Sequence, residues 1–389
     1  MAESATVAQD AISPGLLGPA ELDEEDLAAL VREHLGRPGL QLQDWWAEPV
    51  DYPAGTPSTG LLVRVKGVAA DRDGAVRWSV FVKLLQSLRH WQFLHLIPAQ
   101  ILEEQLEYFP WRVEADRYRS DLASLLPQGM RLPRVYRVDD LGDERIVLWL
   151  EDVQTIDAPW DIPRFERAAY LLGRLAARRA EDRLAPDERT SPVQALYYYN
   201  SARTALTLPM LQDDATWSHP LVAGAVDARL RIDTLTLATR FTAILHALGR
   251  LPQTLAHGDA SPQNLLVPAD DPDSFVVIDW GFSSTLLPVG FDLAQLLVGL
   301  SHAGRFDPDK LPTLHEAIIT PYATGLRKEG MVVAEEQVRY GYVGSLVMQS
   351  ALSALPLERL SDQPTPELER LFAIRARLAR FIVDLGLAL

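Results

Sequence analysis

Hydrophobic and polar positions follow two different periods along this chain, one typical of strands and the other of helices. Residues 21–35 repeat apolar positions at helical spacing with acids in the first turn, which predicts an amphipathic helix. From Leu42 apolar and polar residues alternate instead, and turn signals separate the successive runs. This alternation predicts five strands, which begin at Leu42 and continue through LLVRVKGVAA (61–70), RWSVFVKLL (77–85), RLPRVYRVDD (131–140) and RIVLWLEDV (145–153).

Helical periodicity dominates the rest of the chain. Between the third and fourth strands, residues 97–126 have a helical pattern that Pro110 breaks. Further helices are expected at 164–180, 196–211, 221–248, 311–326, 333–354 and 366–388. We therefore expect an α+β protein, with an antiparallel five-stranded sheet and helices in the N-terminal part and a mainly α-helical C-terminal part.

The length of 389 residues exceeds what one ordinary hydrophobic core supports, so two domains are expected. Residues 1–20, rich in Ala, Gly, Ser and Pro, are expected to form a flexible N-terminal tail.

Composition excludes several classes of function. The net charge of -16 argues against nucleic acid as a partner, because binding to a phosphate backbone needs basic patches. The chain has no cysteine, which excludes disulfides, thiolate catalysis and cysteine-ligated metals. It shows neither a signal-peptide pattern nor an apolar run near the roughly 20 residues of a membrane helix. We expect a cytoplasmic protein with no membrane partner.

The most informative stretch is LAHGDASPQNLLVPADDPDSFVVIDWG, residues 255–281. It places Asp259 five residues before Asn264, and an apolar run directly before Asp279. An aspartate, with an ordinary pKa of about 4, is ionised at neutral pH and can orient a hydroxyl and accept its proton. Carboxylate and amide oxygens are the hard ligands that Mg²⁺ prefers. Asp259 is therefore the candidate catalytic base, and Asn264 and Asp279 are the candidate metal ligands of a phosphate-transfer site.

This spacing, H-G-D-x-x-x-x-N followed by D-W-G, resembles the H-R-D-x-x-x-x-N and D-F-G motifs of kinases. Glycine in the second place makes it similar to the aminoglycoside phosphotransferase family and its choline-kinase-like relatives. The resemblance implies a two-lobed protein-kinase-like fold, with nucleotide bound in the N-terminal lobe, residues 21–152, and the acceptor in the C-terminal lobe, residues 153–389. The alternative is a β-hairpin with capping acids in an unrelated fold. A protein kinase is disfavoured because the arginine of H-R-D is absent and no recognisable A-P-E segment follows D-W-G.

The resemblance also implies nucleotide-binding residues in the N-terminal lobe. Lys83 ends a V-F-V-K run similar to the V-A-I-K strand whose lysine contacts phosphates, although a surface lysine on an edge strand would look the same. Glu114 is the acid expected to hold it. Thr59 and Gly60 lie where a phosphate-covering loop is expected, with an ordinary hairpin turn as the alternative. Leu150 and Glu151 lie where the chain crosses between lobes and adenine meets the backbone.

Two further residues are expected to support the site without reacting. His257 shapes the loop through hydrogen bonds in such enzymes. Asp292 resembles the buried acid that accepts hydrogen bonds from the catalytic-loop backbone, with a simple helix cap as the alternative.

The expected enzyme is a small-molecule kinase that transfers the γ-phosphate of ATP, or of GTP, with Mg²⁺ to a hydroxyl group. The acceptor class stays open among antibiotics, sugars, nucleosides and amino alcohols, which leaves antibiotic resistance as one role. Two alternatives also stay open: a catalytically silent nucleotide-binding regulatory protein, and nucleotidyl transfer in the same fold. The protein is expected as a monomer or homodimer. Eight residues of the helical lobe are candidate acceptor contacts: Tyr197, Tyr198, Tyr199, Asp213, Asp214, Trp217, His302 and Tyr322.

Overall fold

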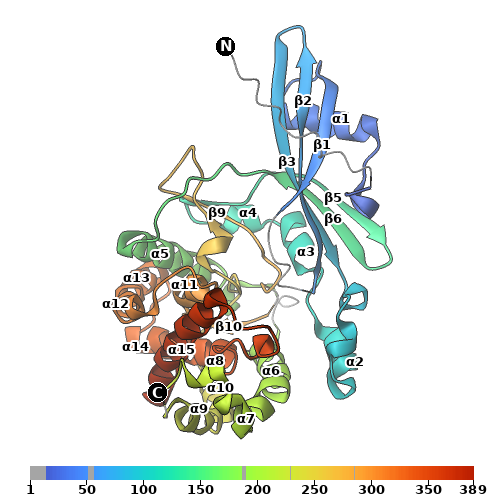
Figure 1. Ribbon diagram of the computed structural model, residues 1–389. Helices are drawn as coiled ribbons and strands as arrows, with labels where there is room; N and C mark the ends of the chain where they lie inside the picture. The colour runs from blue at the N-terminus through green and yellow to red at the C-terminus, as the bar shows by residue number, and fades with distance from the viewer. Residues whose placement is uncertain (1–14, 51–56, 186–189, 228, 284) are drawn as a thin grey trace, which may run out of the picture. The chain divides into compact units, whose positions relative to one another are not determined.

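The computed structural model describes residues 15–50, 57–185, 190–227, 229–283 and 285–389 (Figure 1). The chain divides into two compact units, each described here by itself. The first unit comprises the described residues up to Leu122 together with Leu132–Gln154, and the second comprises Ala123–Arg131 and the residues from Thr155 onward. This division differs from the expected one over Ala123–Arg131, which were expected in the first domain.

The first unit is built on one five-stranded sheet (Figure 1). Every neighbouring pair in it is antiparallel, and its strand order is β1-β2-β3-β6-β5. The strands are β1 (Gln41–Pro49), β2 (Thr59–Asp71), β3 (Gly74–Gln86), β5 (Val135–Gly142) and β6 (Arg145–Glu151). The five-stranded antiparallel sheet predicted from the alternation is confirmed.

The alternating pattern exists because one face of this sheet is covered by a helix. Val63, Val65, Val80 and Val82 are fully buried at every second position of β2 and β3. The buried side chains of α1 (Glu24–Leu35) join them in one core. Asp23 caps the first turn of α1, where its side chain accepts a hydrogen bond from the Asp26 amide. The sequence pattern therefore fixes both the strands and the side that faces the core.

The expected tail is only partly described, because residues 1–14 lie outside the described residues. The described end of it is ordered: it forms the short 3-10 helix η1 (Gly18–Ala20). Leu17 and Ala20 are buried in the core of the first unit. Burial of these two side chains is what distinguishes residues 15–20 from a flexible tail.

The segment that connects β3 to β5, the next strand of this sheet along the chain, is mainly helical, as expected, and its helices are interrupted near Pro110. It contains η2 (Leu88–His90), η3 (Leu94–Leu96), α2 (Ala99–Tyr108), α3 (Val113–Arg119) and α4 (Leu122–Leu125). Proline lacks a backbone N–H and cannot continue a helix interior, so α2 ends before it and α3 begins after it.

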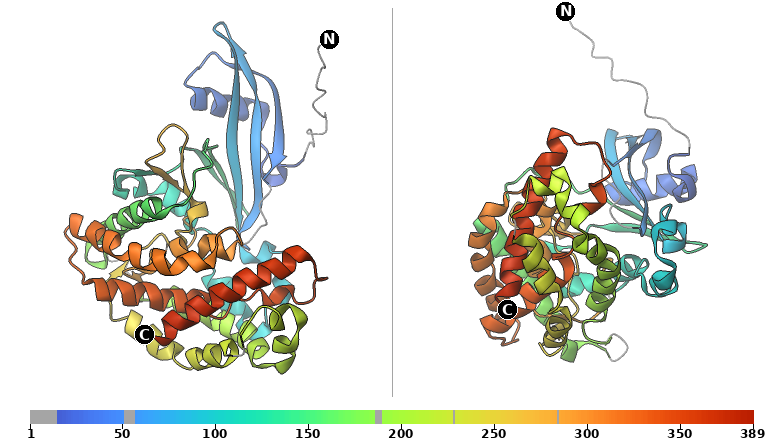
Figure 2. Two further views of the ribbon diagram at one scale, coloured as in Figure 1. Left: turned by 60° about the vertical axis from the view of Figure 1, so that its left-hand side comes forward. Right: turned by 60° about the horizontal axis from the view of Figure 1, so that its bottom comes forward.

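The second unit is mainly helical (Figure 2). Its longer helices are α5 (Ile162–Arg178), α6 (Gln194–Gln212), α11 (Phe291–His302), α13 (Ile319–Lys328), α14 (Glu335–Ser350) and α15 (Pro366–Leu387). Its shorter helical segments are η4 (Glu181–Arg183), α7 (Asp214–Ser218), α8 (Pro220–Ala223), α9 (Leu230–Ala238), α10 (Phe241–Leu248), η6 (Pro262–Asn264), η7 (Pro308–Lys310), α12 (Leu311–Ala317) and η8 (Leu357–Arg359). The expected helix over 221–248 is therefore three helices. Gly224 follows the last residue of α8, and Gly249 follows the last residue of α10. These glycines mark where the helical hydrogen bonding ends.

The second unit also contains two small β-sheets. β4 (Met130–Arg131), β9 (Phe275–Val277) and β8 (Leu265–Leu266) form one, in that order. β7 (Gln253–Thr254) and β10 (Leu287–Pro288) form the other. Because β4 pairs with β9, the segment before it belongs to this unit.

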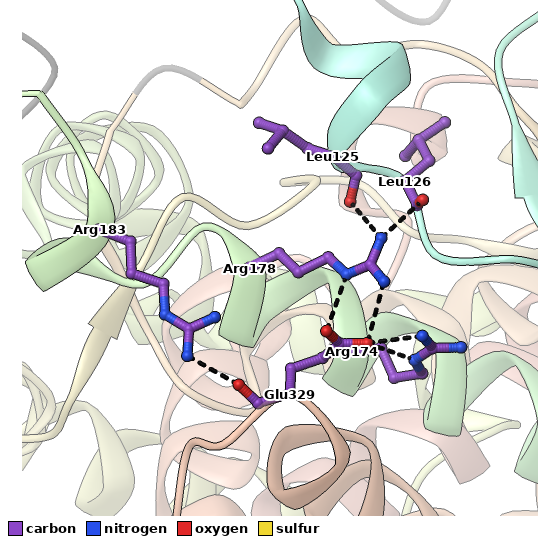
Figure 3. A network of polar contacts seen from close by, with 6 residues as sticks. All are labelled: Leu125, Leu126, Arg174, Arg178, Arg183 and Glu329. Atoms are coloured by element: carbon purple, nitrogen blue, oxygen red, sulfur yellow. Dashed lines mark hydrogen bonds and ion pairs between the residues drawn. The ribbon is translucent and has the colours of Figure 1, made fainter.

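An arginine network explains further why Ala123–Arg131 pack with the helical unit (Figure 3). Arg178 of α5 donates from Nη1 to the Leu126 carbonyl at 2.9 Å. Its other nitrogens contact the carboxylate of Glu329, which Arg174 also contacts at 2.6 Å. Glu329 follows α13, so the network ties α4, α5 and α13 together.

Candidate active site

The loop that follows β7 is held by the carboxylate of Asp292. The backbone N–H groups of His257 and Gly258 donate to its two oxygens, each at 2.9 Å. Asp292 is the second residue of α11 and is 2% exposed. A carboxylate in the first helical turn is favoured by the helix dipole, and here both of its oxygens also bind the loop. Asp292 therefore fixes the backbone immediately before Asp259.

His257 is fully buried and uses both ring nitrogens. Nε2 lies 2.9 Å from the Ile278 carbonyl, and Nδ1 lies 3.2 Å from the Asp259 amide nitrogen. A carbonyl only accepts and an amide N–H only donates, so the proton is on Nε2 and the ring is neutral. Burial lowers the pKa of His257, which agrees with a neutral ring. The imidazole thus links the Asp259 loop to the strand end before Asp279.

Gly258 permits a close approach that no other residue would. Its φ is +95°, and a Cβ built on it would lie 2.5 Å from the Phe282 carbonyl oxygen. Glycine alone adopts this conformation without strain and leaves this space open. The glycine of H-G-D is therefore required where the loop meets the residues after D-W-G.

Asn264 and Asp279 are brought to the same end of a β-hairpin. Leu265 pairs with Val277 in the β8–β9 ladder, and the Ile278 amide donates to the Asn264 carbonyl at 3.1 Å. Asp279 follows directly and has a φ of +62°, a left-handed conformation that aspartate tolerates better than most residues. The hairpin register therefore places the two candidate metal ligands beside each other.

Asn264 also contacts the candidate base. Its Nδ2 donates to the Asp259 carbonyl oxygen at 2.9 Å and to Asp259 Oδ2 at 3.0 Å. Asn264 is 8% exposed, so these bonds are shielded from water. Since the amide nitrogen faces Asp259, the amide oxygen is directed elsewhere and keeps its capacity as a ligand.

Trp280, in the place of the phenylalanine of D-F-G, is fully buried. Its Nε1 donates to the Val277 carbonyl at 3.1 Å, and its ring lies 4.5 Å from that of His257. Sequence reasoning missed Arg179, which is 1% exposed and places its guanidinium 5.7 Å from the Trp280 ring. Arg179 also donates to the Ala256 carbonyl. Nothing in the run RLAARRA distinguishes this buried arginine from Arg174 and Arg178, which are only partly buried.

In the first unit, Lys83 and Glu114 form a buried ion pair. Lys83 Nζ of β3 lies 2.6 Å from Glu114 Oε2 of α3, and the two side chains are 10% and 3% exposed. Lys83 lies in a central strand, between β2 and β6, rather than on an edge. Glu114 is thus the acid that meets this lysine.

The other expected nucleotide contacts lie at strand ends of the same sheet. Thr59 and Gly60 begin β2, where Thr59 pairs with Leu85 of β3 and the register shifts between Thr59 and Leu61, so Gly60 lies at an irregularity of the ladder. The turn residues Gly55 and Thr56 lie outside the described residues. Leu150 and Glu151 end β6 next to the division between the units. The Glu151 amide donates to the Arg134 carbonyl at 2.8 Å.

Most candidate acceptor contacts are already used for structure. Tyr322 is 1% exposed and its hydroxyl accepts from the Gly290 amide at 3.0 Å, while burial raises its pKa. Trp217 donates to the Leu211 carbonyl at 2.8 Å. Asp213 caps α7, and Asp214 pairs with Arg231. Tyr197 and Tyr198 contact each other edge to face, and the Tyr199 side chain lies outside the described part. The His302 carbonyl accepts from Arg375 Nη1 at 3.0 Å, and burial lowers the pKa of the His302 ring well below its usual value.

The described residues contain no group of three or more His, Asp or Glu side chains that could hold a metal by itself. No described helix is long and apolar enough to cross a membrane. A site that shares its metal with phosphate oxygens needs only two protein ligands, and the Asn264–Asp279 pair has this form.

The loop aspartate, the asparagine five residues later and the second aspartate after a buried strand define the class of this protein as a phosphotransferase. A comparison with family models gives the same class. The model described as the phosphotransferase enzyme family matches residues 110–329, more than half of the chain. The chain belongs to this family, which confirms the predicted resemblance and the prediction of a kinase-type enzyme.

Several solved structures resemble the chain at low identity. An aminoglycoside phosphotransferase from Streptomyces rimosus, solved with ADP and streptomycin, is 18% identical, with 85% of this chain and 99% of that chain covered and a TM-score of 0.42. A spectinomycin phosphotransferase solved with ADP and spectinomycin is 13% identical, with 94% and 97% covered and a TM-score of 0.47. A choline kinase from Cryptosporidium parvum is 11% identical, with 94% and 95% covered and a TM-score of 0.47. A search of curated proteins gave no match.

Proposed function

We propose that this protein transfers the γ-phosphate of ATP, or of GTP, to a hydroxyl group of a small molecule. In this reaction the acceptor oxygen forms a bond to the γ-phosphorus. The bond between the γ-phosphorus and the oxygen that bridges it to the β-phosphate breaks. The hydroxyl proton goes to Asp259 and the nucleoside diphosphate leaves. The bond from Asn264 Nδ2 to Asp259 Oδ2 is the observation that best supports this assignment, because it joins the base to a metal ligand.

Mg²⁺ suits the two protein oxygens that the hairpin brings together. Asn264 and Asp279 would hold the ion, with phosphate oxygens and water completing its coordination. Bound there, it would neutralise charge on the phosphates. Lys83, positioned by Glu114, is proposed to contact the phosphates from the first unit.

The remaining parts of the nucleotide site are proposed at strand ends of the first unit. Thr59 and Gly60 would offer backbone N–H groups to the phosphates at the start of β2, and Leu150 and Glu151 would meet the adenine. We place the enzyme in the cytoplasm, where nucleotide and magnesium are available, as a monomer or homodimer.

The test measures nucleotide consumption with magnesium against a panel of hydroxylated metabolites and antibiotics. Asp259→Asn is expected to reduce transfer by about 100-fold or more while nucleotide binding persists. Asp273→Asn, the same change in the exposed loop before β9, is the matched control and should leave transfer unchanged. Nucleotide binding without transfer to any acceptor would favour the silent regulatory protein. A product carrying a nucleotide would favour nucleotidyl transfer.

A further inference from the structure

The end of α5 lies against the chain that leads into the catalytic loop. Arg179 follows the last residue of α5, and its carbonyl oxygen accepts a hydrogen bond from the Leu255 amide at 2.9 Å. Ala180 and Thr254 form an antiparallel bridge beside this bond. These backbone contacts place Arg179 beside the residues that precede Asp259.

The guanidinium of Arg179 contacts both segments of the candidate site. Its Nη1 donates to the carbonyl of Ala256, three residues before Asp259, at 3.4 Å. Its central carbon lies 5.7 Å from the centre of the ring of Trp280, the residue after Asp279. A planar guanidinium can lie over an aromatic ring and donate in its own plane at the same time, whereas a lysine ammonium is a point charge. One side chain therefore links the segment of the candidate base to the segment of a candidate metal ligand.

Arg179 and Asp292 hold the same stretch of backbone through opposite charges. The Asp292 carboxylate accepts from the amides of His257 and Gly258, whereas the Arg179 guanidinium donates to the carbonyl of Ala256. Asp292 is 2% exposed and Arg179 is 1% exposed, so little water competes for these bonds. Burying a charged group costs free energy. A buried cation at this point of the chain therefore indicates that the loop needs a charged donor there.

The guanidinium also lies in the electrostatic neighbourhood of the acids of the site. Burial is the main cause that lowers the pKa of His257. The charges of Asp292 and Asp279 act on the same imidazole and raise this pKa, while the charge of Arg179 lowers it. Because all three charges act on one ring, the cation offsets part of the negative charge around the loop.

We propose that Arg179 is a positioning residue for phosphate transfer, whose guanidinium holds the segments of Asp259 and Asp279 at a fixed separation through Ala256 and Trp280. The inference rests on the proposed function, because it assigns Arg179 to the support of the proposed base and metal ligand. Arg179 acts through these two contacts and not on the reacting atoms. Removal of a group that supports a metal ligand typically reduces metal affinity or activity by about 10- to 100-fold.

The experiment measures binding of AMP-PNP, a non-hydrolysable analogue of ATP, by calorimetry in EDTA and in saturating Mg²⁺. The ratio of the two Kd values reports how much the metal contributes to nucleotide binding. Partial unfolding changes both Kd values equally and leaves their ratio unchanged. We expect Arg179→Met, which removes the charge and the donors, to lower this ratio by about tenfold. An unchanged ratio in Arg179→Met overturns the inference.

Two further variants separate positioning from folding. Arg179→Lys keeps the buried charge but not the planar fork, so it should fold and still lower the ratio by about threefold or more. Arg174→Met is the matched control on the same helix, where Arg174 contacts Glu329 at 2.6 Å with both side chains 16% exposed (Figure 3). It should lower the urea midpoint and leave the ratio unchanged. An unchanged ratio in Arg179→Lys, or an equal decrease in Arg174→Met, overturns the inference.

The role of Arg179 and the proposed function fail in different ways. A wild-type protein that binds AMP-PNP equally well in EDTA and in Mg²⁺ would overturn the metal site of the proposed function. A wild-type protein whose binding is tightened by Mg²⁺, to the same extent as that of Arg179→Met, would overturn only the positioning role of Arg179.

Discussion

Asn264 donates a hydrogen bond from its side-chain nitrogen to the carboxylate of Asp259, with 3.0 Å between Nδ2 and Oδ2. The same nitrogen reaches the Asp259 carbonyl at 2.9 Å. One amide therefore contacts the candidate base through its nitrogen, and its oxygen is the proposed metal ligand.

Replacing Asn264 by aspartate would place a second carboxylate beside Asp259. Two carboxylates at this separation share a proton, because like charges close together cannot both ionise easily. We expect Asn264→Asp to reduce kcat/KM by at least about tenfold at neutral pH and to move the acid limb of the activity profile to higher pH. The measurement is kcat/KM across pH. A profile with the wild-type shape would contradict the proposed contact.

Removing the charge of Glu114 tests the buried ion pair with Lys83. Glu114→Gln takes away the negative charge 2.6 Å from the Lys83 ammonium, where both side chains are almost fully buried. We expect the free energy of unfolding to fall by about 3 kcal/mol and the KM for nucleotide to rise. Urea unfolding and nucleotide kinetics measure the two effects.

The Lys66–Glu48 pair on the same sheet is the matched control. Its two charged atoms are also 2.6 Å apart, but its side chains are 33% and 41% exposed. Glu48→Gln should therefore cost about 1 kcal/mol or less and leave nucleotide kinetics unchanged. Equal decreases in the free energy of unfolding for Glu114→Gln and Glu48→Gln would show that burial does not strengthen the contribution of the Lys83–Glu114 pair to stability.

Gly258→Ala tests the close contact between the two loops. The new Cβ would lie 2.5 Å from the Phe282 carbonyl and would force a left-handed conformation on alanine. We expect a loss of about 2 kcal/mol or more in stability, and loss of activity in the protein that still folds. Gly142→Ala is the control, since its φ is +73° but no atom lies within 4 Å of its Cβ. That variant should lose only about 1 kcal/mol.

Buried histidines predict a loss of stability in acid. Burial lowers the pKa of His257 in the folded protein, so below its ordinary value of about 6.5 the unfolded chain binds a proton that the folded chain does not. The free energy of unfolding should therefore be constant above about pH 7 and fall as the pH drops below about 6.5. Urea unfolding over this range should show a smaller fall for His257→Gln than for the wild-type protein. Exposed His246→Gln should keep the wild-type dependence, and an equal fall in all three proteins would contradict the assignment.

The fold was predictable where local patterns agree with long-range packing. The strands around Val63 and Val80 alternate because one face of the sheet is buried, and the pattern alone identified them. The helix expected over 221–248 is three helices in the structure. The prediction missed this division because apolar spacing does not show where neighbouring helices force a turn. Leu17 and Ala20 looked like part of a tail because two apolar residues carry no period, although the core buries both.

The site was predictable where one stretch of sequence contains it. Asp259, Asn264 and Asp279 lie within a single hairpin and its approach, so their spacing carries the geometry. Arg179 and Tyr322 come from distant helices, and nothing local shows that the first lies under Trp280 or that the second supports Gly290. The eight candidate acceptor contacts lie on or beside α6, α7, α11 and α13. Local spacing does not show how these helices pack, which explains why the candidates could not be ranked from the sequence.

The mass of the modified acceptor tests the central claim most directly. The acceptor is incubated with ATP, magnesium and the wild-type protein, and the product is analysed by mass spectrometry beside Asp259→Asn and Asp273→Asn. Phosphoryl transfer predicts a gain of about 80 Da with the wild-type protein and Asp273→Asn, and a yield of that product lower by about 100-fold or more with Asp259→Asn. A gain equal to a nucleotide, or an undiminished gain of about 80 Da with Asp259→Asn, would contradict the account.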